Sequence, residues 1–202
     1  MSYIAIIDYE VGNLMSVSNA LTYLGLESRI ISRPEELESA DAVILPGVGA
    51  FPDAADKLRL RGMDRAVLEQ GKRKPVLGIC LGMQLLLERG TEVRPCRGLG
   101  VVGGVCDRIP TALKLPHIGW NSLHFPRESP LFQGVEEGSY VYFVHSFSAQ
   151  QVSPEQVIAE TDYGVPVVAA VQNGNFVGCQ FHPEKSGEVG LQILRNFGRW
   201  NR

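Results

Sequence analysis

The stretch LGICLGMQLL, from Leu77 to Leu86, places Cys80 inside an apolar run with a glycine two residues away on either side. The apolar run from Pro75 to Ile79 is typical of a buried strand, and we expect a helix from Leu81 to about Arg89. Strand, Gly-x-Cys-x-Gly and helix form the pattern of a nucleophile elbow, a sharp turn that exposes a nucleophile at the carboxyl end of a strand. The stretch therefore indicates a catalytic cysteine, although an inert core cysteine is equally compatible with these residues alone.

The neighbours of Cys80 suit a reactive thiol. Small residues at Gly78 and Gly82 let a strained turn form without clashes between the strand and the helix. The free amides and positive dipole end of the following helix favour a thiolate, and the Leu81 amide can donate to an oxyanion. The other three cysteines lack such a context, and we expect them to be structural: Cys96, Cys106 and Cys179.

Short apolar runs alternate with amphipathic stretches through the first half of the chain, which predicts βαβ units around a parallel sheet. The expected strands are residues 3–7, 28–32, 41–46 and 75–79, and the expected helices are 14–24, a short one from 34, and 51–71. The second half has the character of antiparallel strands, with a two-residue hairpin turn predicted at Asn173-Gly174 and a last helix over residues 189–200. We expect these strands to extend the same sheet, so that residues 1–202 form a single domain of the α/β class.

Composition excludes several classes of protein. The 202 residues include 19 basic and 22 acidic side chains without a basic stripe, so we expect no nucleic-acid partner. No apolar run approaches the roughly 18 residues of a membrane span, and residues 1–13 do not resemble a secretory signal. Four scattered cysteines argue against a disulfide framework, so we expect a cytoplasmic protein with reduced thiols and no membrane association.

The segment FHPEKS, from Phe181 to Ser186, offers a base and an orienting acceptor for the thiol. Residues two apart in an extended segment face the same side, so His182 and Glu184 would point together, with Pro183 stiffening the arrangement. A lone His-Pro-Glu is usually an ordinary loop. In a chain with a cysteine elbow, we interpret it as the rest of a catalytic triad.

The turn PGVGAF, from Pro46 to Phe51, follows a predicted strand and can aim backbone amides at developing negative charge. It lacks the GK[ST] ending of a phosphate-binding loop, so a nucleoside triphosphate is not indicated. Taken alone, a simple tight connection is an equally good interpretation.

Together, GICLGMQLL, FHPEKS and PGVGAF resemble the triad-type (class I) glutamine amidotransferases. With DYEVGNLMSV (8–17), PHIGWN (116–121) and YFVHSF (142–147), the resemblance narrows to the glutaminase subunits of imidazole glycerol phosphate synthase, which act in histidine biosynthesis, and covers the whole chain. It implies a flavodoxin-like, mostly parallel sheet flanked by helices, with antiparallel additions in the C-terminal half. It also implies a heterodimer with a (β/α)8-barrel cyclase that receives ammonia through a channel, and neither cofactor nor metal in this subunit.

The resemblance implies a role for each matching residue. Cys80, His182 and Glu184 would be the catalytic triad, with oxyanion donors at Val48, Gly49 and Leu81. The residues implied in glutamine binding are Gly49, Gln84, His145, Ser146 and Phe147, and those implied at the cyclase interface are Asn13, Trp120, Asn121 and Lys185. From the residues alone, Gln84 could be a solvent-facing helix residue, Trp120 a core aromatic and Lys185 a solvated charge. The resemblance also fits a Gly47–Val48 peptide that turns inward when the partner binds its ribotide.

Other functions are compatible with parts of the pattern. The glutaminase of pyridoxal phosphate synthase is similar in size, but it carries a Gly-Gly-Glu oxyanion loop where this chain has Pro46-Gly47-Val48-Gly49. A stand-alone cysteine hydrolase of related fold, or a noncatalytic binding module, are further alternatives, and the second predicts a missing triad member. A fused carbamoyl phosphate or guanylate synthetase domain is disfavoured, because the chain given ends soon after FHPEKS.

Overall fold

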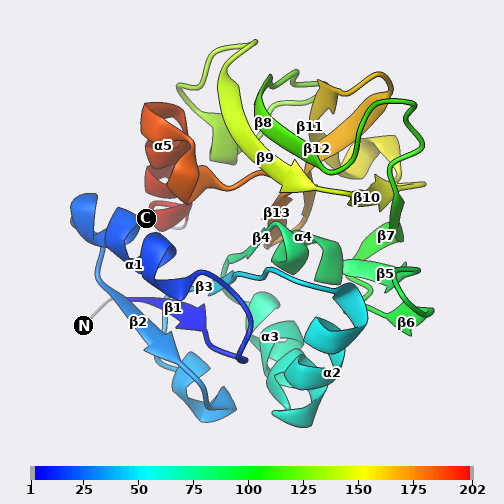
Figure 1. Cartoon of the computed structure of the whole chain (residues 1–202). Coiled ribbons are helices and arrows are strands. Elements are labelled where there is room, and N and C mark those ends of the chain that lie inside the picture. The colour runs from blue at the N-terminus through cyan, green and yellow to red at the C-terminus, as the bar shows by residue number, and fades with distance from the viewer. Residues whose placement is uncertain (1–2, 201–202) are drawn as a thin grey trace.

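The computed structural model describes residues 3–200, and its largest element is a seven-stranded sheet of order β11-β12-β13-β4-β3-β1-β2 (Figure 1). Five neighbouring strands are parallel. β12 then pairs antiparallel with β13, and β11 pairs antiparallel with β12. The parallel strands are β1 (Ile4–Ile7), β2 (Ser28–Ile31), β3 (Ala42–Leu45), β4 (Val76–Ile79) and β13 (Phe176–Cys179), and the antiparallel ones are β11 (Val157–Asp162) and β12 (Pro166–Asn173). The predicted α/β class with a mostly parallel sheet is confirmed.

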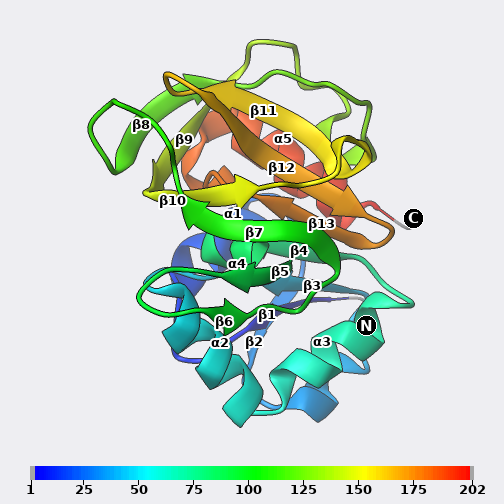
Figure 2. The same cartoon turned by 90° about the vertical axis from the view of Figure 1, so that its right-hand side faces the viewer.

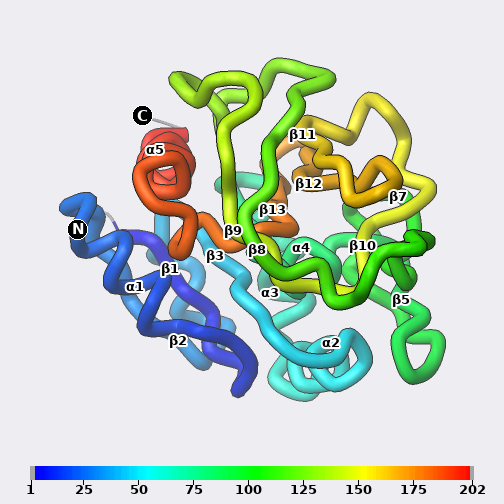
Figure 3. Tube along the Cα trace, turned by 45° about the horizontal axis from the view of Figure 1, so that its top comes forward, coloured from blue at the N-terminus to red at the C-terminus, as the bar shows by residue number. Residues whose placement is uncertain are grey.

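Helices cover both faces of the sheet because its strands are apolar on both sides. In β1, Ala5 and Ile7 pack into the core beneath α2 (Phe51–Leu60) and α3 (Met63–Gly71), whereas Ile4 and Ile6 pack toward the other face. That face is covered by α1 (Leu14–Tyr23) and α5 (Gly187–Gly198), which lie beside each other (Figures 1 and 3). Short 3₁₀ turns, η1 (Pro34–Leu37), η2 (Pro130–Phe132), η3 (Pro154–Gln156) and η4 (Pro183–Lys185), complete the helical segments. Within residues 3–200, none of the helices has the length and apolar character needed to cross a membrane.

Not every strand of the second half joins the main sheet, so the prediction of one extended sheet is wrong in part. A separate four-stranded sheet has the order β10 (Phe147–Gln150), β7 (Val102–Arg108), β5 (Leu87–Gly90) and β6 (Cys96–Arg97) (Figure 2). A two-stranded ribbon pairs β8 (His117–Ser122) with β9 (Tyr140–His145). These strands cannot pair with β4, because β3 and β13 already occupy both of its edges.

The helix after Cys80 is shorter than predicted. It is α4 (Leu81–Leu85), and the chain then continues directly into β5 instead of remaining helical to Arg89. The carbonyls that a longer helix would use accept hydrogen bonds from a distant segment instead. Leu85 O accepts from Leu99 N at 2.7 Å, and Leu86 O accepts from Val101 N at 3.0 Å. Tertiary pairing with the segment before β7 therefore ends the helix.

The predicted hairpin is present, with its turn displaced by one residue. Asn173 pairs with Phe176, so Gly174 and Asn175 form the two-residue connection between β12 and β13. Gly174 has a φ of +57°, a conformation that favours glycine in such turns.

Candidate active site

Cys80 occupies a sharp turn between β4 and α4 at the carboxyl end of the central strand. Its φ of +54° and ψ of −109° are strained for a residue with a side chain. Its amide donates to Cys179 O at 2.7 Å, which continues the pairing of β4 with β13 up to the turn itself. The turn therefore has the geometry of a nucleophile elbow.

The two glycines around Cys80 are required by close packing. A Cβ on Gly82 would lie 1.8 Å from Leu45 O of β3, and one on Gly78 would lie 2.6 Å from Gly82 O in α4. Neither contact is possible for a real side chain, because both neighbours are backbone. The spacing of the glycines thus lets α4 begin directly against the ends of β3 and β4.

His182 and Glu184 are joined by a buried hydrogen bond of 2.8 Å between His182 Nδ1 and Glu184 Oε1. Their side chains are only 3% and 1% exposed. The expected extended geometry is wrong: residues 183–185 form the 3₁₀ turn η4, and His182 is the extended residue before it. The turn, rather than strand alternation, folds the carboxylate back onto the imidazole.

Ser186 fixes this turn against the ribbon. Its hydroxyl donates to His182 O at 2.7 Å and accepts from Tyr142 N at 3.0 Å, and His182 N donates to Tyr142 O at 3.0 Å. Ser186 belongs to the quoted FHPEKS motif, but nothing in its residue type indicated this role.

The environment of His182 favours its protonated form. Burial acts to lower the pKa of the imidazole, but hydrogen bonding and charge from Cys80 and Glu184 outweigh it and raise the pKa to about 9. Since Nδ1 is engaged with Glu184, only Nε2 is left for the thiol, and this buried atom has no other partner among residues 3–200. The arrangement suits a thiolate–imidazolium pair.

The predicted site residues surround one cavity of about 370 Å³, within the roughly 300–1,000 Å³ range of small-molecule sites. Cys80 and His182 both line it, and Glu184 lies behind His182. The other predicted residues on its wall are Val48, Gly49, Leu81, Gln84, His145, Ser146 and Phe147. Segments separated by about a hundred residues in sequence thus meet at the carboxyl edge of the sheet, where open α/β sheets bind ligands.

Gln84 is a buried cavity residue and not a solvent-facing one, with 5% of its surface exposed. Its amide nitrogen donates to Phe147 O at 3.1 Å and to Gln180 Oε1 at 3.0 Å. Gln180 in turn places its Nε2 3.7 Å from Cys80 Sγ. Sequence reasoning missed Gln180, although its position two residues before His182 could have drawn attention to it.

Glu92 is a second residue that the sequence did not reveal. It follows β5 and lines the same cavity, and its Oε2 accepts from Phe51 N at 2.8 Å. A carboxylate on the wall of this cavity is a suitable acceptor for an ammonium group. No motif surrounds Glu92, so only the fold identifies it.

The Pro46–Phe51 turn is tied to the rest of the fold at both of its ends. Tyr9 donates from its buried hydroxyl to Pro46 O at 2.7 Å, and Phe51 N is held by Glu92. Gly47 packs so closely that a Cβ there would lie 2.6 Å from Tyr9 OH. Gly49 has a φ of +105°, and Val48 is 43% exposed at the cavity. The backbone of the predicted oxyanion donors is thus held between two fixed points.

The four residues expected at a partner interface lie outside the cavity lining. Trp120 is 55% exposed, so its interpretation as a core aromatic is wrong. Lys185 is exposed in η4, and Asn13 caps α1 by accepting from Ser16 N at 3.4 Å. Asn121 is half-buried, and its amide donates to Asp162 O, at the end of β11, at 2.7 Å.

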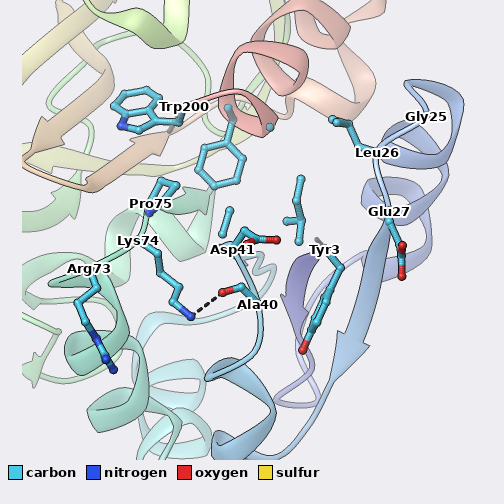
Figure 4. Close-up of a pocket in the computed structure, with 14 residues that line it drawn as sticks. Tyr3, Gly25, Leu26, Glu27, Ala40, Asp41, Arg73, Lys74, Pro75 and Trp200 are labelled. Atoms are coloured by element: carbon cyan, nitrogen blue, oxygen red, sulfur yellow. Dashed lines mark hydrogen bonds between the residues drawn. The ribbon is translucent and has the colours of Figure 1, made fainter. Parts of the chain in front are cut away.

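A second and larger cavity, of about 560 Å³, lies at the opposite edge of the sheet (Figure 4). Its lining comes from the segments that precede the parallel strands, together with the end of α5. Its most buried cation, Lys74, already donates to the carbonyls of Leu37, Glu38 and Ala40. The residues that line it include no cysteine and no histidine, so it offers no nucleophile with a base.

The remaining cysteines are free thiols without activation. Burial raises the pKa of Cys106 and of Cys179 far above the ordinary value of 9.0, which keeps both thiols protonated. Cys96 is also buried, in β6.

Comparison with known proteins gives one consistent family. The model of the family "Glutamine amidotransferase class-I" matches residues 5–199. The chain is 50% identical over 196 residues to imidazole glycerol phosphate synthase subunit HisH from Bacillus thuringiensis (strain Al Hakam), covering 96% of this chain and 93% of that protein. HisH from Bacillus anthracis matches with the same identity and coverage.

Solved structures agree on the fold. A crystal structure of a glutamine amidotransferase superposes with a TM-score of 0.76 at 19% identity, covering 96% of this chain and 98% of that one. PurLQS from Thermotoga maritima superposes with a TM-score of 0.75 at 20% identity, covering 100% of this chain and 99% of the matched one. On the family match and the identity to HisH, this chain belongs to the class-I glutamine amidotransferases and, among them, to the imidazole glycerol phosphate synthase HisH family.

Proposed function

We propose that this chain hydrolyses glutamine to glutamate and ammonia as the glutaminase subunit of an imidazole glycerol phosphate synthase. The observation that carries the proposal is the convergence of Cys80, His182 and Glu184 at one cavity. Identity to HisH over nearly the whole chain supports this synthase. As the recipient of the ammonia we propose a (β/α)8-barrel cyclase subunit.

The residues around the cavity account for each chemical step. The Cys80 thiolate attacks the side-chain amide carbon of glutamine, and the resulting oxyanion accepts from the Leu81 amide and an amide of the Val48–Gly49 segment. His182, protonated in the resting pair, gives its proton to the leaving nitrogen, and ammonia departs from a thioester on Cys80. Water deprotonated by His182 then attacks the thioester and releases glutamate. Glu184 keeps the imidazole oriented throughout.

Binding of the substrate uses the polar wall of the same cavity. The Glu92 carboxylate is a suitable acceptor for the α-ammonium group of glutamine, because one of its oxygens is committed to Phe51 N and the other remains for a ligand. Gln84 and the backbone of His145, Ser146 and Phe147 line the same cavity, where they can bind other polar groups of the substrate.

The exposed apolar side chains of the β8–β9 ribbon support docking of the cyclase there. Ile118, Trp120 and Tyr140 are each more than half exposed, at 59%, 55% and 59%. A cluster of this kind on a chain that acts in a heterodimer is typical of an interface. Asn13, between β1 and α1, and Lys185, in η4 after β13, follow the carboxyl ends of their strands, and we include both in the docking surface.

The test separates glutamine hydrolysis from ring closure. Cys80→Ala, mixed with the cyclase and its ribotide substrate, should form product with added ammonium but not with glutamine. Cys106→Ala serves as the matched control and should use both nitrogen sources. A glutamine-derived electrophile should label wild-type Cys80 alone. Glutamine-dependent product from Cys80→Ala would contradict the assignment, and hydrolysis without any cyclase-dependent product would favour a different acceptor enzyme or a stand-alone hydrolase.

A further inference from the structure

A continuous line of hydrogen bonds inside the β8–β9 ribbon is not used by the mechanism above. His117 and His145 stand directly opposite each other in the ribbon, and His117 Nδ1 lies 3.2 Å from His145 Nε2. On one side, His117 Nε2 lies 3.3 Å from Asn121 Nδ2. On the other, His145 Nδ1 lies 2.8 Å from Phe147 O. Both imidazoles are buried, at 2% and 6% exposure.

The chemistry of the end groups sets the direction of every bond. A carbonyl oxygen only accepts, so His145 must carry its proton on Nδ1 and offer Nε2 as an acceptor. His117 must then donate from Nδ1, which leaves its Nε2 to accept from the Asn121 amide. The same amide nitrogen donates its second proton to Asp162 O at 2.7 Å. This one set of tautomers satisfies the Phe147 carbonyl, both imidazoles and the Asn121 amide.

The surroundings keep these rings neutral and in place. Burial lowers the pKa of His117, and burial lowers that of His145 to about 4, against the opposing effect of the Phe147 carbonyl. The His117 ring stacks between Phe143 and Tyr163, with centroids 4.7 Å and 4.0 Å away. Phe143 of the ribbon and Tyr163, which follows β11, therefore leave the ring of His117 little freedom to turn.

The line ends in the substrate cavity. Phe147 O accepts from His145 and also from Gln84, which bonds to Gln180 beside Cys80. His145, Ser146 and Phe147 form one wall of the cavity. The Phe147 carbonyl sets the proton of His145 on Nδ1, and the bond that His117 donates to Nε2 excludes a proton there and holds the ring, so the position of this wall depends on both bonds.

We propose that His117 and His145 are positioning residues whose matched tautomers hold the 145–147 backbone and Gln84 in the arrangement that binds glutamine. The inference rests on the proposed glutaminase function. Without the His117 bond, the His145 ring is fixed at Nδ1 alone and its Nε2-protonated tautomer, which cannot bond to the Phe147 carbonyl, is no longer excluded, so the cavity wall loosens while the Cys80–His182 pair remains intact.

The critical variant is His117→Phe, which keeps an aromatic ring in the stack and removes both hydrogen bonds. In the complex with the cyclase, we expect the KM for glutamine to rise about tenfold, as the loss of one buried hydrogen bond implies, with a much smaller change in kcat. Alkylation of Cys80 by iodoacetamide should proceed at the wild-type rate, because that reagent needs the thiolate but not the cavity wall. His117→Gln, which can donate and accept, should recover part of the loss.

Tyr163→Leu is the matched control, because it removes a stacking partner of His117 but no bond of the line. Because Phe143 still stacks on His117, the KM should rise much less than in His117→Phe. A KM rise equal to that of His117→Phe would show that packing, and not the tautomer, matters, and would overturn the proposal.

Nitrogen-detected NMR of the wild-type histidine rings provides a test that needs no variant and no activity. It should show His145 protonated at Nδ1 and not at Nε2, and His117 protonated at Nδ1; the opposite pattern on His145 contradicts the proposal. A wild-type complex that hydrolyses no glutamine would refute the proposed function. Hydrolysis with an unchanged KM in His117→Phe would refute only the positioning role.

Discussion

Cys80 combines a strained backbone with the thiol that we propose as the nucleophile. Its positive φ is a conformation that a glycine would adopt more easily, and for other residues such strain costs about 1–3 kcal/mol. The neighbouring glycines lower the cost of the turn by allowing α4 to pack against β3 and β4 without moving either strand. The strained turn thus lowers stability at Cys80 and, in return, places its thiol at the edge of the sheet.

Gly82→Ala tests this packing. The added Cβ would lie 1.8 Å from Leu45 O, so backbone must shift, and we expect a loss of roughly 1–3 kcal/mol in the free energy of unfolding. Denaturant unfolding measures this quantity. Gly103→Ala is the control, because the nearest atom to its Cβ is 3.4 Å away at the end of the Gln156 side chain, and it should change stability little. Equal effects of the two variants would contradict the close-packing argument.

The protonation of His182 should depend on Cys80. NMR titration of the wild type should give a pKa of about 9 for His182 and about 4 for His145 in the same cavity. In Cys80→Ala the pKa of His182 should fall, because burial remains while the bond and charge of Cys80 are gone. An unchanged His182 pKa in the variant would show that Glu184 alone sustains it.

This shift also predicts a pH dependence of stability. A folded pKa raised from 6.5 to about 9 stabilises the protonated, folded form, so the contribution is complete below pH 6.5 and disappears as the pH rises to about 9. The excess unfolding free energy of the wild type over Cys80→Ala should therefore shrink between these two pH values. Thermal or denaturant unfolding across this range measures it, and a growing excess would have the wrong sign.

At the scale of elements, the loop between β3 and α2 is tethered at both of its ends. Tyr9 holds Pro46 O, and Glu92 holds Phe51 N, so conformational freedom is confined to residues 47–50. A turn of the Gly47–Val48 peptide would need only local rotations between these two anchors. Position 47 requires a glycine chiefly because Tyr9 OH and Leu81 fill the space that a side chain would occupy.

Tyr9→Phe should release the first anchor without opening a cavity. We expect about 1 kcal/mol of lost stability and a larger proportional fall in kcat than rise in KM, since the loop carries predicted oxyanion donors, which act on the charge that develops in the transition state. Steady-state glutaminase kinetics of the complex separate these two effects. Tyr23→Phe, on an exposed tyrosine of α1, is the control, and a pure KM effect in Tyr9→Phe would contradict the argument.

For the molecule as a whole, the two edges of the sheet have different characters. The carboxyl edge bears the cavity and the exposed apolar side chains of the ribbon, whereas the amino edge bears a cavity whose lysine is saturated by carbonyls. A partner that receives ammonia has to cover the edge where ammonia is released. We therefore expect the cyclase to bind over the ribbon.

Trp120→Ala should weaken binding of the cyclase at least about tenfold, as expected for a central aromatic of an interface, while the unfolding free energy of the isolated chain stays unchanged. Isothermal titration calorimetry measures the affinity. Leu60→Ala removes an even more exposed apolar side chain, at the end of α2 away from the carboxyl edge, and should not alter it. Weakening by Leu60→Ala alone would place the interface on the other side of the molecule.

Much of the architecture follows from local pattern. The apolar runs of β1 to β4, the helix beginning after Asn13 and the Gly-x-Cys-x-Gly elbow are all visible in order along the chain, because strand burial and steric limits at a turn act over a few residues. The residue at which α4 ends cannot be predicted from this local pattern. It depends on carbonyls of Leu85 and Leu86 that bond to residues 99–101.

The sequence by itself determined which residues can do chemistry here: a cysteine in a tight turn, a histidine next to a glutamate, and a loop with free amides. Only the tertiary structure decided that they share one cavity with Glu92 and Gln180, and that His117 and His145 form a line leading to it. The reason is physical: the constraints of a turn are local, whereas hydrogen bonds between distant segments exist only once the sheet has brought those segments together.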